Sequence, residues 1–313
     1  MAKFLCITLN PAIDFTVSLD SLRVGEVNRQ QSAQSHAAGK GLNVAQVLRD
    51  LGHEITVSGF LGRDNAAVFQ VHFAAMGFSD RFVYVDGETR TNVKIAEANG
   101  RMTDINGKGF AVSAADKAAL LALAEELAAA ADFVAVSGSL PQQFAPQDLQ
   151  ELLGRLKNTN PHIAVDTSGA ALTAAVACNP YLIKPNTDEL HESFGGAAGN
   201  AAEQAALLAD TGAEITHAVV SMGEHGVNWL HDGLCLHASA AKVEVKSTVG
   251  AGDTLMAGML HGLASGFTPE DTLRTAAALA ANAVSQVGFR VPDAGRLNEL
   301  KQSVTIQTES IPS

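Results

Sequence analysis

Strand-like and helix-like segments alternate along most of this 313-residue chain, and this alternation restricts the fold more than any other feature. Short apolar runs favour buried strands, and apolar residues recurring every three or four positions favour helices packed on a sheet. A strand–helix–strand order is typical of α/β proteins with a largely parallel sheet. The expected strands cover residues 4–9, 54–60, 133–137, 162–166, 181–183, 218–221 and 242–245, with a hairpin at 227–236, and the expected helices cover 41–51, 65–76, 114–131, 146–157, 170–178, 251–265 and 269–287.

Capping and turn residues support several of these boundaries. Ser113 and Asp116 have the spacing of a capping box at the start of one helix. Thr268 precedes a proline at the start of another, and Asp64 is the expected cap of the helix at 65–76. Asp232-Gly233 is typical of a tight hairpin turn.

Two segments break the alternation. Residues 14–35 interleave polar and apolar side chains, and residues 91–105 favour two short strands around Asn99-Gly100. Neither segment leaves room for a helix. We expect them to pair into a small β-sheet that projects from the core as a lid, within one domain spanning residues 1–313. The alternative is two ordinary surface hairpins.

The charge balance excludes several kinds of partner. The chain has 21 Lys+Arg against 33 Asp+Glu, a net charge of −12, whereas a nonspecific nucleic-acid binder needs a basic face. No run approaches the roughly 18 uncharged apolar residues that a membrane span needs, and the first apolar block is too short for a secretory signal. Three widely spaced cysteines, Cys6, Cys178 and Cys235, favour reduced thiols. We therefore expect a cytoplasmic protein that binds neither nucleic acid nor membrane.

The ends of the expected strands point to a ligand site, because ligands of open parallel sheets bind outside the carboxyl ends of the strands. The most informative end is residues 247–254, which lead into an Ala- and Gly-rich helix. Gly250, Ala251 and Gly252 leave the N–H groups of the helix N-terminus open to an anion. Asp253 follows in the first turn, and the alternative is that it caps the helix.

A carboxylate beside an anion site suits the transfer of a phosphoryl group to a hydroxyl. The backbone donors neutralise charge on the phosphoryl group, and Asp253 accepts the proton of the attacking alcohol. Asn186 and Glu189 place an amide and a carboxylate one helical turn apart, which suits Mg²⁺ held through water. The alternative for this pair is an ordinary helix cap.

A second glycine turn precedes the helix at 41–51. It is not a P-loop, because Lys40 is followed by Gly41 rather than by Ser or Thr, and no dinucleotide-binding glycine motif opens this helix. Lys40 and Asn43 lie beside exposed backbone amides at Gly39. A polyhydroxy substrate is the expected occupant.

The chain resembles the PfkB (ribokinase-like) carbohydrate kinase family over essentially its whole length. The two glycine turns match the two signatures of that family at residues 38–45 and 247–254, and the second match is highly specific. Ala38 departs from the pattern, since many members have glycine there. Further matches to the members that act on fructose 1-phosphate lie at residues 8–14, 60–65, 89–94, 137–141 and 184–186.

The resemblance implies a three-layer α/β sandwich with a mostly parallel central sheet and a small β lid that often pairs with a second subunit, so a homodimer is expected. It also implies roles for individual residues. Asp253 is the base, and Gly250, Ala251 and Gly252 form the anion hole. The resemblance implies that Asp14, Gly39, Lys40 and Asn43 bind the sugar hydroxyls. It implies that Arg90, Ser139, Arg29 and Lys94 bind the phosphate already on the sugar. The residues that the resemblance implies for nucleotide binding are Lys184, Asn186, Ser221, Gly223, Glu224, Thr248, Val249 and Asn282, together with the three residues of the anion hole. Those implied for Mg²⁺ are Asn186 and Glu189.

The activity that the resemblance implies is ATP-dependent phosphorylation of fructose 1-phosphate to fructose 1,6-bisphosphate. Kinases of tagatose 6-phosphate and of fructose 6-phosphate in the same family are the close alternatives. A different class is a nucleotide- or sugar-binding regulator without catalysis. Asp253 beside the anion site argues against a regulator, because a pure binder needs no base aimed at its ligand.

Overall fold

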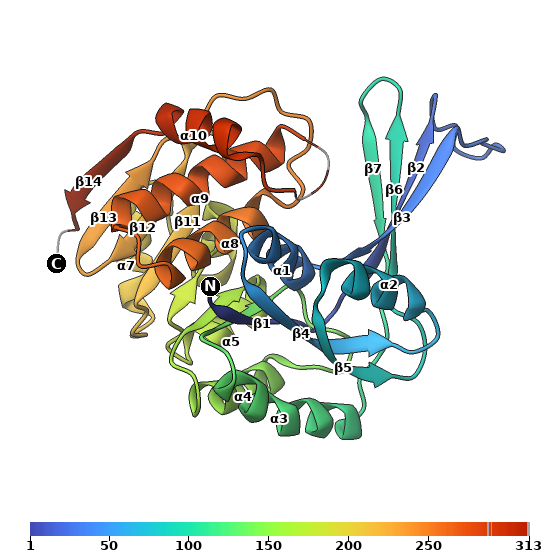
Figure 1. Ribbon diagram of the computed structural model, residues 1–313, viewed down its shortest axis with the longest axis horizontal. Coiled ribbons are helices and arrows are strands. Elements are labelled where there is room, and N and C mark those ends of the chain that lie inside the picture. The colour runs from blue at the N-terminus through green and yellow to red at the C-terminus, as the bar shows by residue number, and fades with distance from the viewer. Residues whose placement is uncertain (287, 289, 312–313) are drawn as a thin grey trace.

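Two β-sheets organise the computed structural model, which describes residues 1–286, 288 and 290–311 (Figure 1). The larger sheet runs in the order β14-β13-β12-β11-β10-β9-β8-β1-β4-β5. Its strands from β11 to β5 are parallel, and β12 to β14 extend it in antiparallel fashion. These strands are β1 (Lys3–Thr8), β4 (Glu54–Gly62), β5 (Ser79–Val85), β8 (Phe133–Ser137), β9 (Ile163–Asp166), β10 (Leu182–Ile183), β11 (His217–Ser221), β12 (Val227–His231), β13 (Leu234–Ala238) and β14 (Ile306–Ser310).

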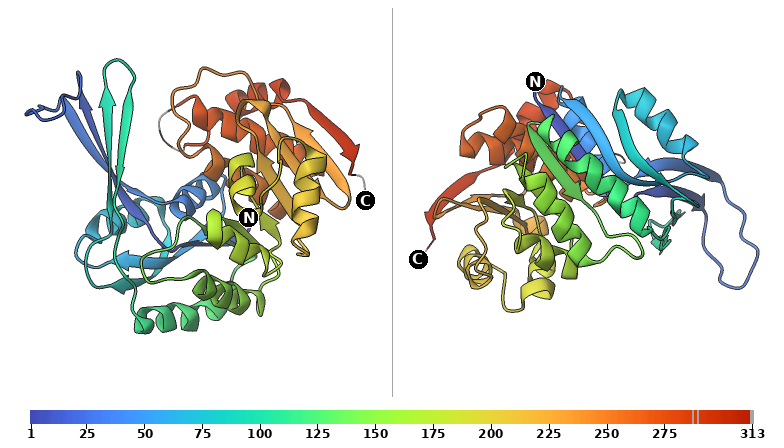
Figure 2. Two further views of the ribbon diagram at one scale, coloured as in Figure 1. Left: turned by 180° about the vertical axis from the view of Figure 1, so that it is seen from behind. Right: turned by 90° about the horizontal axis from the view of Figure 1, so that it is seen from below.

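Helices cover both faces of this sheet and give the expected three layers (Figure 2). Successive residues of a strand point to opposite faces, so Val219 packs in the core on one side and Val220 in the core on the other. One layer contains α1 (Lys40–Asp50), α2 (Ala67–Met76), α8 (Ala251–Ala264), α9 (Pro269–Val284) and α10 (Ala294–Ser303), and the other contains α3 (Ala114–Ala129), α4 (Pro146–Lys157), α5 (Gly169–Val176), α6 (Thr187–Phe194) and α7 (Ala201–Asp210).

The small sheet expected from the two exceptional segments is present and projects from the rest of the molecule (Figure 1). Its order is β3-β2-β6-β7. The parallel pairing of β2 with β6 joins the two segments, so they are one sheet rather than two separate hairpins. Its strands are β2 (Ala12–Leu19), β3 (Ser32–Ala38), β6 (Thr91–Glu97) and β7 (Met102–Asn106).

Most of the local sequence signals are confirmed. The capping box of Ser113 and Asp116 opens α3, and the Thr268 side chain caps α9. Asp232 and Gly233 have φ values of 49° and 73°, the left-handed geometry of a tight hairpin turn. Asp64 is wrong as a cap, because α2 starts at Ala67 and no side chain caps it.

Other boundaries differ from expectation. Residues 242–245 alternate like a strand but form none, and the outer edge of β13 pairs instead with β14. The last core helix ends at Val284 rather than at 287, which lies outside the described residues. The elements β5, α7, α10 and β14 were not expected.

Close packing of α8 on α9 fixes the helix that carries the second glycine turn. A Cβ atom added at Gly258 in α8 would lie 2.6 Å from the Cα atom of Ala276 in α9. Only a glycine lets the two backbones approach this closely. The small-residue composition of these helices therefore places the N-terminus of α8 firmly at the edge of the sheet.

Two further expectations concern the whole chain. Within the described residues, no helix combines the length and apolar character that a membrane span requires. Cys6, Cys178 and Cys235 are free thiols, and Cys6 and Cys235 are buried.

Candidate active site

A cleft of about 400 Å³ lies where the carboxyl ends of the parallel strands meet the small sheet. Asp166 ends β9, Lys184 directly follows β10, and Ser221 ends β11. The small sheet contributes Asp14 and Asn92. Of the site residues expected from the sequence, the cleft is lined by Asp14, Gly39, Lys40, Asn43, Arg90, Lys184, Asn186, Glu189, Ser221, Thr248, Val249, Gly250, Gly252 and Asp253.

The N-terminus of α8 opens into this cleft. Gly250 precedes the helix with φ of 80°, a left-handed conformation that favours glycine, and no side chain caps the helix. A Cβ atom at position 252 would lie 3.1 Å from the Nζ atom of Lys184, so glycine lets the ammonium approach the backbone. The exposed amides and the helix dipole make this end of α8 suited to an anion.

Asp253 does not cap α8, because its carboxylate is engaged elsewhere. The Nδ2 atom of Asn43, in α1, donates a hydrogen bond of 2.7 Å to Oδ2 of Asp253. Burial and the neighbouring Asp166 raise the pKa of Asp253 to about 6, while Asn43 and the nearby lysines act in the opposite direction. A carboxyl group with a pKa near 6 is ionised at neutral pH and is a stronger base than an exposed aspartate.

Asp166 organises the positive charge of the cleft. Its Oδ1 atom lies 3.4 Å from the Nζ atoms of both Lys40 and Lys184. Burial alone would lower the pKa of Lys40, but nearby carboxylates, Asp166 first among them, outweigh burial and raise it. Asp166 is the last residue of the strand expected at 162–166, and its residue type and position predict no particular role. The sequence signal for Asp166 is its position at the end of a buried strand, next to the strand β10 that Lys184 follows.

The residues expected to bind sugar lie on the other side of the cleft. Asp14 accepts hydrogen bonds from Nδ2 of Asn92 at 3.1 Å and from Nζ of Lys94 at 2.6 Å. Gly39 has φ of 144°, and a Cβ atom there would lie 2.8 Å from Cγ2 of Thr8, so the turn packs directly on the end of β1. The polar side chains of the small sheet thus form a preorganised wall.

Backbone carbonyls hold the guanidinium of Arg90 in place. It donates to the carbonyl oxygens of Asn10, Pro11 and Gly107 at 3.0, 3.3 and 3.3 Å. Burial lowers the pKa of this guanidinium, and Asp14 partly opposes the effect. Ser139 lies nearby and accepts from Nδ2 of Asn10 at 3.2 Å. Arg90 is therefore a fixed cation that no carboxylate contacts directly among the described residues.

Asn186 and Glu189 form a reciprocal capping box at the start of α6. The Asn186 N–H donates to Oε2 of Glu189 at 2.8 Å, and the Glu189 N–H donates to Oδ1 of Asn186 at 2.7 Å. Both residues also line the cleft. Oε1 of Glu189 has no hydrogen-bond partner among the described residues, so this hard oxygen fits a hydrated Mg²⁺. No group of three or more acidic, histidine or cysteine ligands is found in the described part of the chain.

The structure does not bring every expected residue to the cleft. Ala251, Ser139 and Lys94 are not among the lining residues, although Lys94 contacts Asp14, which is. The Asn282 amide donates to the carbonyl of Arg290 at 3.2 Å. Gly223 and Glu224 belong to the exposed turn Gly223–His225 after β11. Arg29 lies apart, in a depression on the small sheet beside Leu22 and Ile95.

This geometry defines a class of enzyme. Phosphoryl transfer to a hydroxyl requires a base, backbone donors for the phosphoryl oxygens and nearby positive charge. The cleft contains the buried Asp253 with its raised pKa, the open N-terminus of α8, and the lysines Lys40 and Lys184. The comparisons with known proteins identify the family. The chain belongs to the pfkB family of carbohydrate kinases, whose model matches residues 3–294. It is an ATP-dependent sugar kinase.

Relatives of known name match along nearly the whole chain. The 1-phosphofructokinase of Vibrio cholerae is 43% identical over 97% of this chain and 96% of its own length. That of Escherichia coli K12 is 40% identical over 96% and 97%. The crystal structure of a mutant of phosphofructokinase-2 from Escherichia coli has a TM-score of 0.88 and 24% identity, covering 96% of this chain and 99% of its own. The ribokinase-like fold expected from the sequence is thereby confirmed.

Proposed function

We propose that the chain transfers the γ-phosphoryl group of ATP to fructose 1-phosphate, giving fructose 1,6-bisphosphate and ADP. Relatives named 1-phosphofructokinase that match over nearly their full length support this substrate. The observation that carries the proposal is the position of Asp253, which lies between the glycine turn of α8 and the side chain of Asn43. A base there faces both an anion site and a sugar site.

The proposed mechanism assigns each group one task. Asp253 accepts the proton of the sugar hydroxyl as its oxygen attacks the γ-phosphorus, and the bond from phosphorus to the ADP oxygen breaks. The amides of Gly250, Ala251 and Gly252 and the ammonium of Lys184 stabilise the charge on the phosphoryl oxygens. Lys40 is held beside the same cleft by Asp166.

Magnesium is part of this proposal. Asn186 and the free oxygen of Glu189 would hold it through water, and it would neutralise charge on the triphosphate. Thr248, Val249, Ser221, Gly223, Glu224 and Asn282 are proposed to border the nucleotide.

The phosphate already on the sugar is assigned to Arg90, with Lys94 and Ser139 beside it. Lys94 pairs with Asp14, so its charge is partly neutralised before substrate binds, whereas Arg90 keeps its charge. An anion clamp of this kind recognises a phosphate more readily than the stereochemistry of the sugar behind it. Fructose 6-phosphate and tagatose 6-phosphate are therefore the competing substrates.

The direct test measures kcat/KM with ATP and Mg²⁺ for each of the three sugar phosphates. We expect fructose 1-phosphate to have the highest value. A higher value for either competitor contradicts the substrate assignment, and absence of turnover with all three supports a binding protein instead. The proposed reaction uses ATP, and we place it in the cytoplasm.

The small sheet is proposed to act as a lid and as the contact between two subunits. Val24 and Val27 in the β2–β3 connection are 92% and 77% exposed, and Arg29 lies in the adjoining apolar depression. Apolar exposure of this kind is typical of an interface. Hydrogen exchange should show protection of residues 14–35 and 91–105 when sugar phosphate binds, and sedimentation should show a dimer. Unchanged exchange argues against closure, and a monomer argues against the interface.

A further inference from the structure

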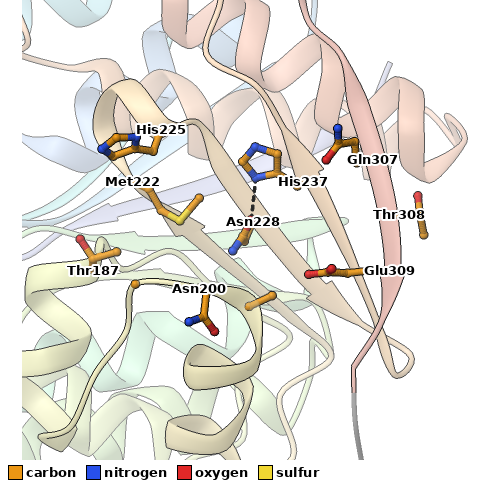
Figure 3. Close-up of a pocket in the computed structure, with 11 residues that line it drawn as sticks. Thr187, Asn200, Met222, His225, Asn228, His237, Gln307, Thr308 and Glu309 are labelled. Carbon is orange, nitrogen blue, oxygen red and sulfur yellow. Dashed lines mark hydrogen bonds between the residues drawn. The ribbon is translucent and has the colours of Figure 1, made fainter.

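A second cavity, of about 620 Å³, lies on the α7 side of the antiparallel end of the large sheet (Figure 3). Thr187 and Met222 form one wall, and Gln307 and Glu309 of β14 stand on the other side. The cavity shares none of its described lining residues with the cleft that contains Asp253. Its volume lies within the range of small-molecule sites, roughly 300 to 1,000 Å³.

A buried relay of amide side chains leads to His237 in this cavity. Gln204 donates from Nε2 to the carbonyl oxygen of Ala198 at 2.9 Å, and its Oε1 accepts from Nδ2 of Asn228 at 2.9 Å. Oδ1 of Asn228 then lies 2.8 Å from Nδ1 of His237. The backbone carbonyl of Ala198 only accepts, so the side-chain amides of Gln204 and Asn228 can each point only one way. Oδ1 of Asn228 is then an acceptor, and Nδ1 of His237 must be the donor. In the neutral ring, Nε2 is then left as an acceptor.

The described lining of the cavity carries a negative formal charge. Among the described residues that line it, none is a lysine or an arginine, and Glu309 is the only carboxylate. His237 pairs across β13 and β14 with Gln307, and Glu309 lies two positions further along the same face. The Cα atoms of two residues in this diagonal relation are about 7–8 Å apart, so one small molecule can contact both side chains.

From the carboxylate of Glu309, the acceptor nitrogen of His237 and the absence of lysine and arginine among the described lining residues, we propose that the cavity binds a small amine that also bears hydroxyl groups. Its ammonium pairs with Glu309, and a hydroxyl or a second N–H of the amine donates to Nε2 of His237. Amino sugars and open-chain amino polyols share this chemistry. Nucleotides and sugar phosphates are disfavoured, because Glu309 repels them and none of the described lining residues is a lysine or an arginine.

The cavity lies directly behind two loops of the kinase cleft. Thr187 follows Asn186, and Met222 follows Ser221. These two loops are joined by a hydrogen bond of 3.1 Å from the Ser221 N–H to the Pro185 carbonyl and by a β-bridge between Asn186 and Ser221. Occupancy of the cavity therefore changes the apparent affinity for ATP. This coupling, unlike the binding itself, rests on the proposed function.

Binding is tested by titration calorimetry of the full chain near neutral pH. The probes are glucosamine, 1-amino-1-deoxysorbitol, sorbitol and glucosamine 6-phosphate. We expect one site per chain for at least one of the two amines, at least fivefold weaker binding of sorbitol, and no binding of glucosamine 6-phosphate. The two amine probes distinguish a cyclic amino sugar from an open-chain amino polyol. Failure of both amines to bind, or equal affinity for sorbitol, overturns the proposal.

Variants locate the site. Glu309→Gln on the exposed edge strand should weaken amine binding at least fivefold without changing kcat, and His237→Phe should weaken it through loss of the acceptor. Glu299→Gln on α10 makes the same charge change far from the cavity and should have no effect. Unchanged binding in Glu309→Gln, or complete displacement of the amine by excess ATP, overturns the assignment. The binding measurements need no turnover, so their outcome does not depend on whether the proposed reaction is correct.

The coupling has its own readout. Saturating amine should change Kd for a nonhydrolysable ATP analogue at least twofold, and saturating analogue should change Kd for the amine by the same factor, because linkage between binding equilibria is reciprocal. An unchanged amine affinity with the analogue bound overturns the coupling while leaving the cavity as a binding site.

Discussion

The Nδ2 atom of Asn43 donates a hydrogen bond of 2.7 Å to the Oδ2 atom of Asp253, across 210 residues of sequence. This contact joins the first turns of α1 and α8, the two helices that follow the glycine turns. It orients the proposed base and favours its charged form, in opposition to burial and to Asp166.

Asp253→Asn is expected to lower kcat by two or more orders of magnitude, because the amide cannot accept the proton of the attacking hydroxyl. The substitution keeps the shape of the side chain, so folding and ATP binding should persist. Steady-state kinetics and nucleotide titration check both statements. A loss of less than about tenfold would show that another group is the base.

Asn43→Ala is expected to shift the acidic limb of the pH profile of kcat/KM to higher pH. In the native protein this limb should lie near the Asp253 pKa of about 6. Removal of a donor to the carboxylate raises that pKa further, so the base becomes protonated at a higher pH. Asn158→Ala at the exposed end of α4 is the matched control. An unmoved limb in Asn43→Ala would separate this contact from the ionisation of Asp253.

Asp166→Asn is expected to move the same limb in the opposite direction. Asp166 raises the pKa of Asp253 through charge repulsion, and a neutral amide removes that repulsion. KM should also increase, since Lys40 and Lys184 lose the carboxylate that both contact. The pH profile distinguishes this variant from a merely destabilised protein. A shift toward higher pH would contradict the electrostatic model of the cleft.

Acid is expected to destabilise the fold through two buried histidines. Burial lowers the pKa values of His53 and His217 to about 4 each. Between pH 6.5 and 4 the unfolded chain binds a proton at each position and the native chain does not. The stability that each histidine contributes is complete above pH 6.5 and falls by about 1.4 kcal/mol per pH unit as the pH decreases.

Urea unfolding between pH 7 and 5 measures this dependence. His53→Gln should flatten it by the share of one histidine, whereas His191→Gln, on the exposed face of α6, should keep the native dependence. Equal slopes for the native chain and His53→Gln would exclude His53 as a source of acid sensitivity.

Gly258→Ala and Gly154→Ala form a matched pair of helical glycine substitutions with opposite expected effects. At Gly258 the added methyl group would meet the backbone of α9, and overpacking of this kind costs about 1–3 kcal/mol or more. At Gly154, in α4, an added Cβ atom would meet nothing within 4 Å outside the neighbouring backbone of its own helix, and alanine should stabilise the helix by about 1 kcal/mol. Denaturant unfolding gives both values. A stable Gly258→Ala protein would contradict the close approach of α8 and α9.

Local sequence determined the elements whose signals are carried by neighbouring residues. The parallel core strands, the cap of α3 by Ser113 and the hairpin turn at Asp232 depend on periodicity and side-chain chemistry within a few positions. The glycine turns were also predictable from the sequence, because only small residues leave the N–H groups of a helix N-terminus open. Residues 242–245 show the limit of such signals. Their alternation predicts a strand, but none forms there. The outer edge of β13 pairs instead with β14, which follows α10 in the sequence.

The assembly and the charge of the site depend on contacts between residues that are far apart in the sequence. Local sequence predicts that Lys40, Lys184 and Asp253 lie at the ends of strands or helices. Asp166 lies close to all three because of the order of the strands in the sheet, which sequence spacing does not predict. Burial then sets the pKa of Asp253, and burial is a property of everything packed around a residue. Residue types therefore fixed the chemistry available to this chain, and packing fixed where that chemistry is concentrated.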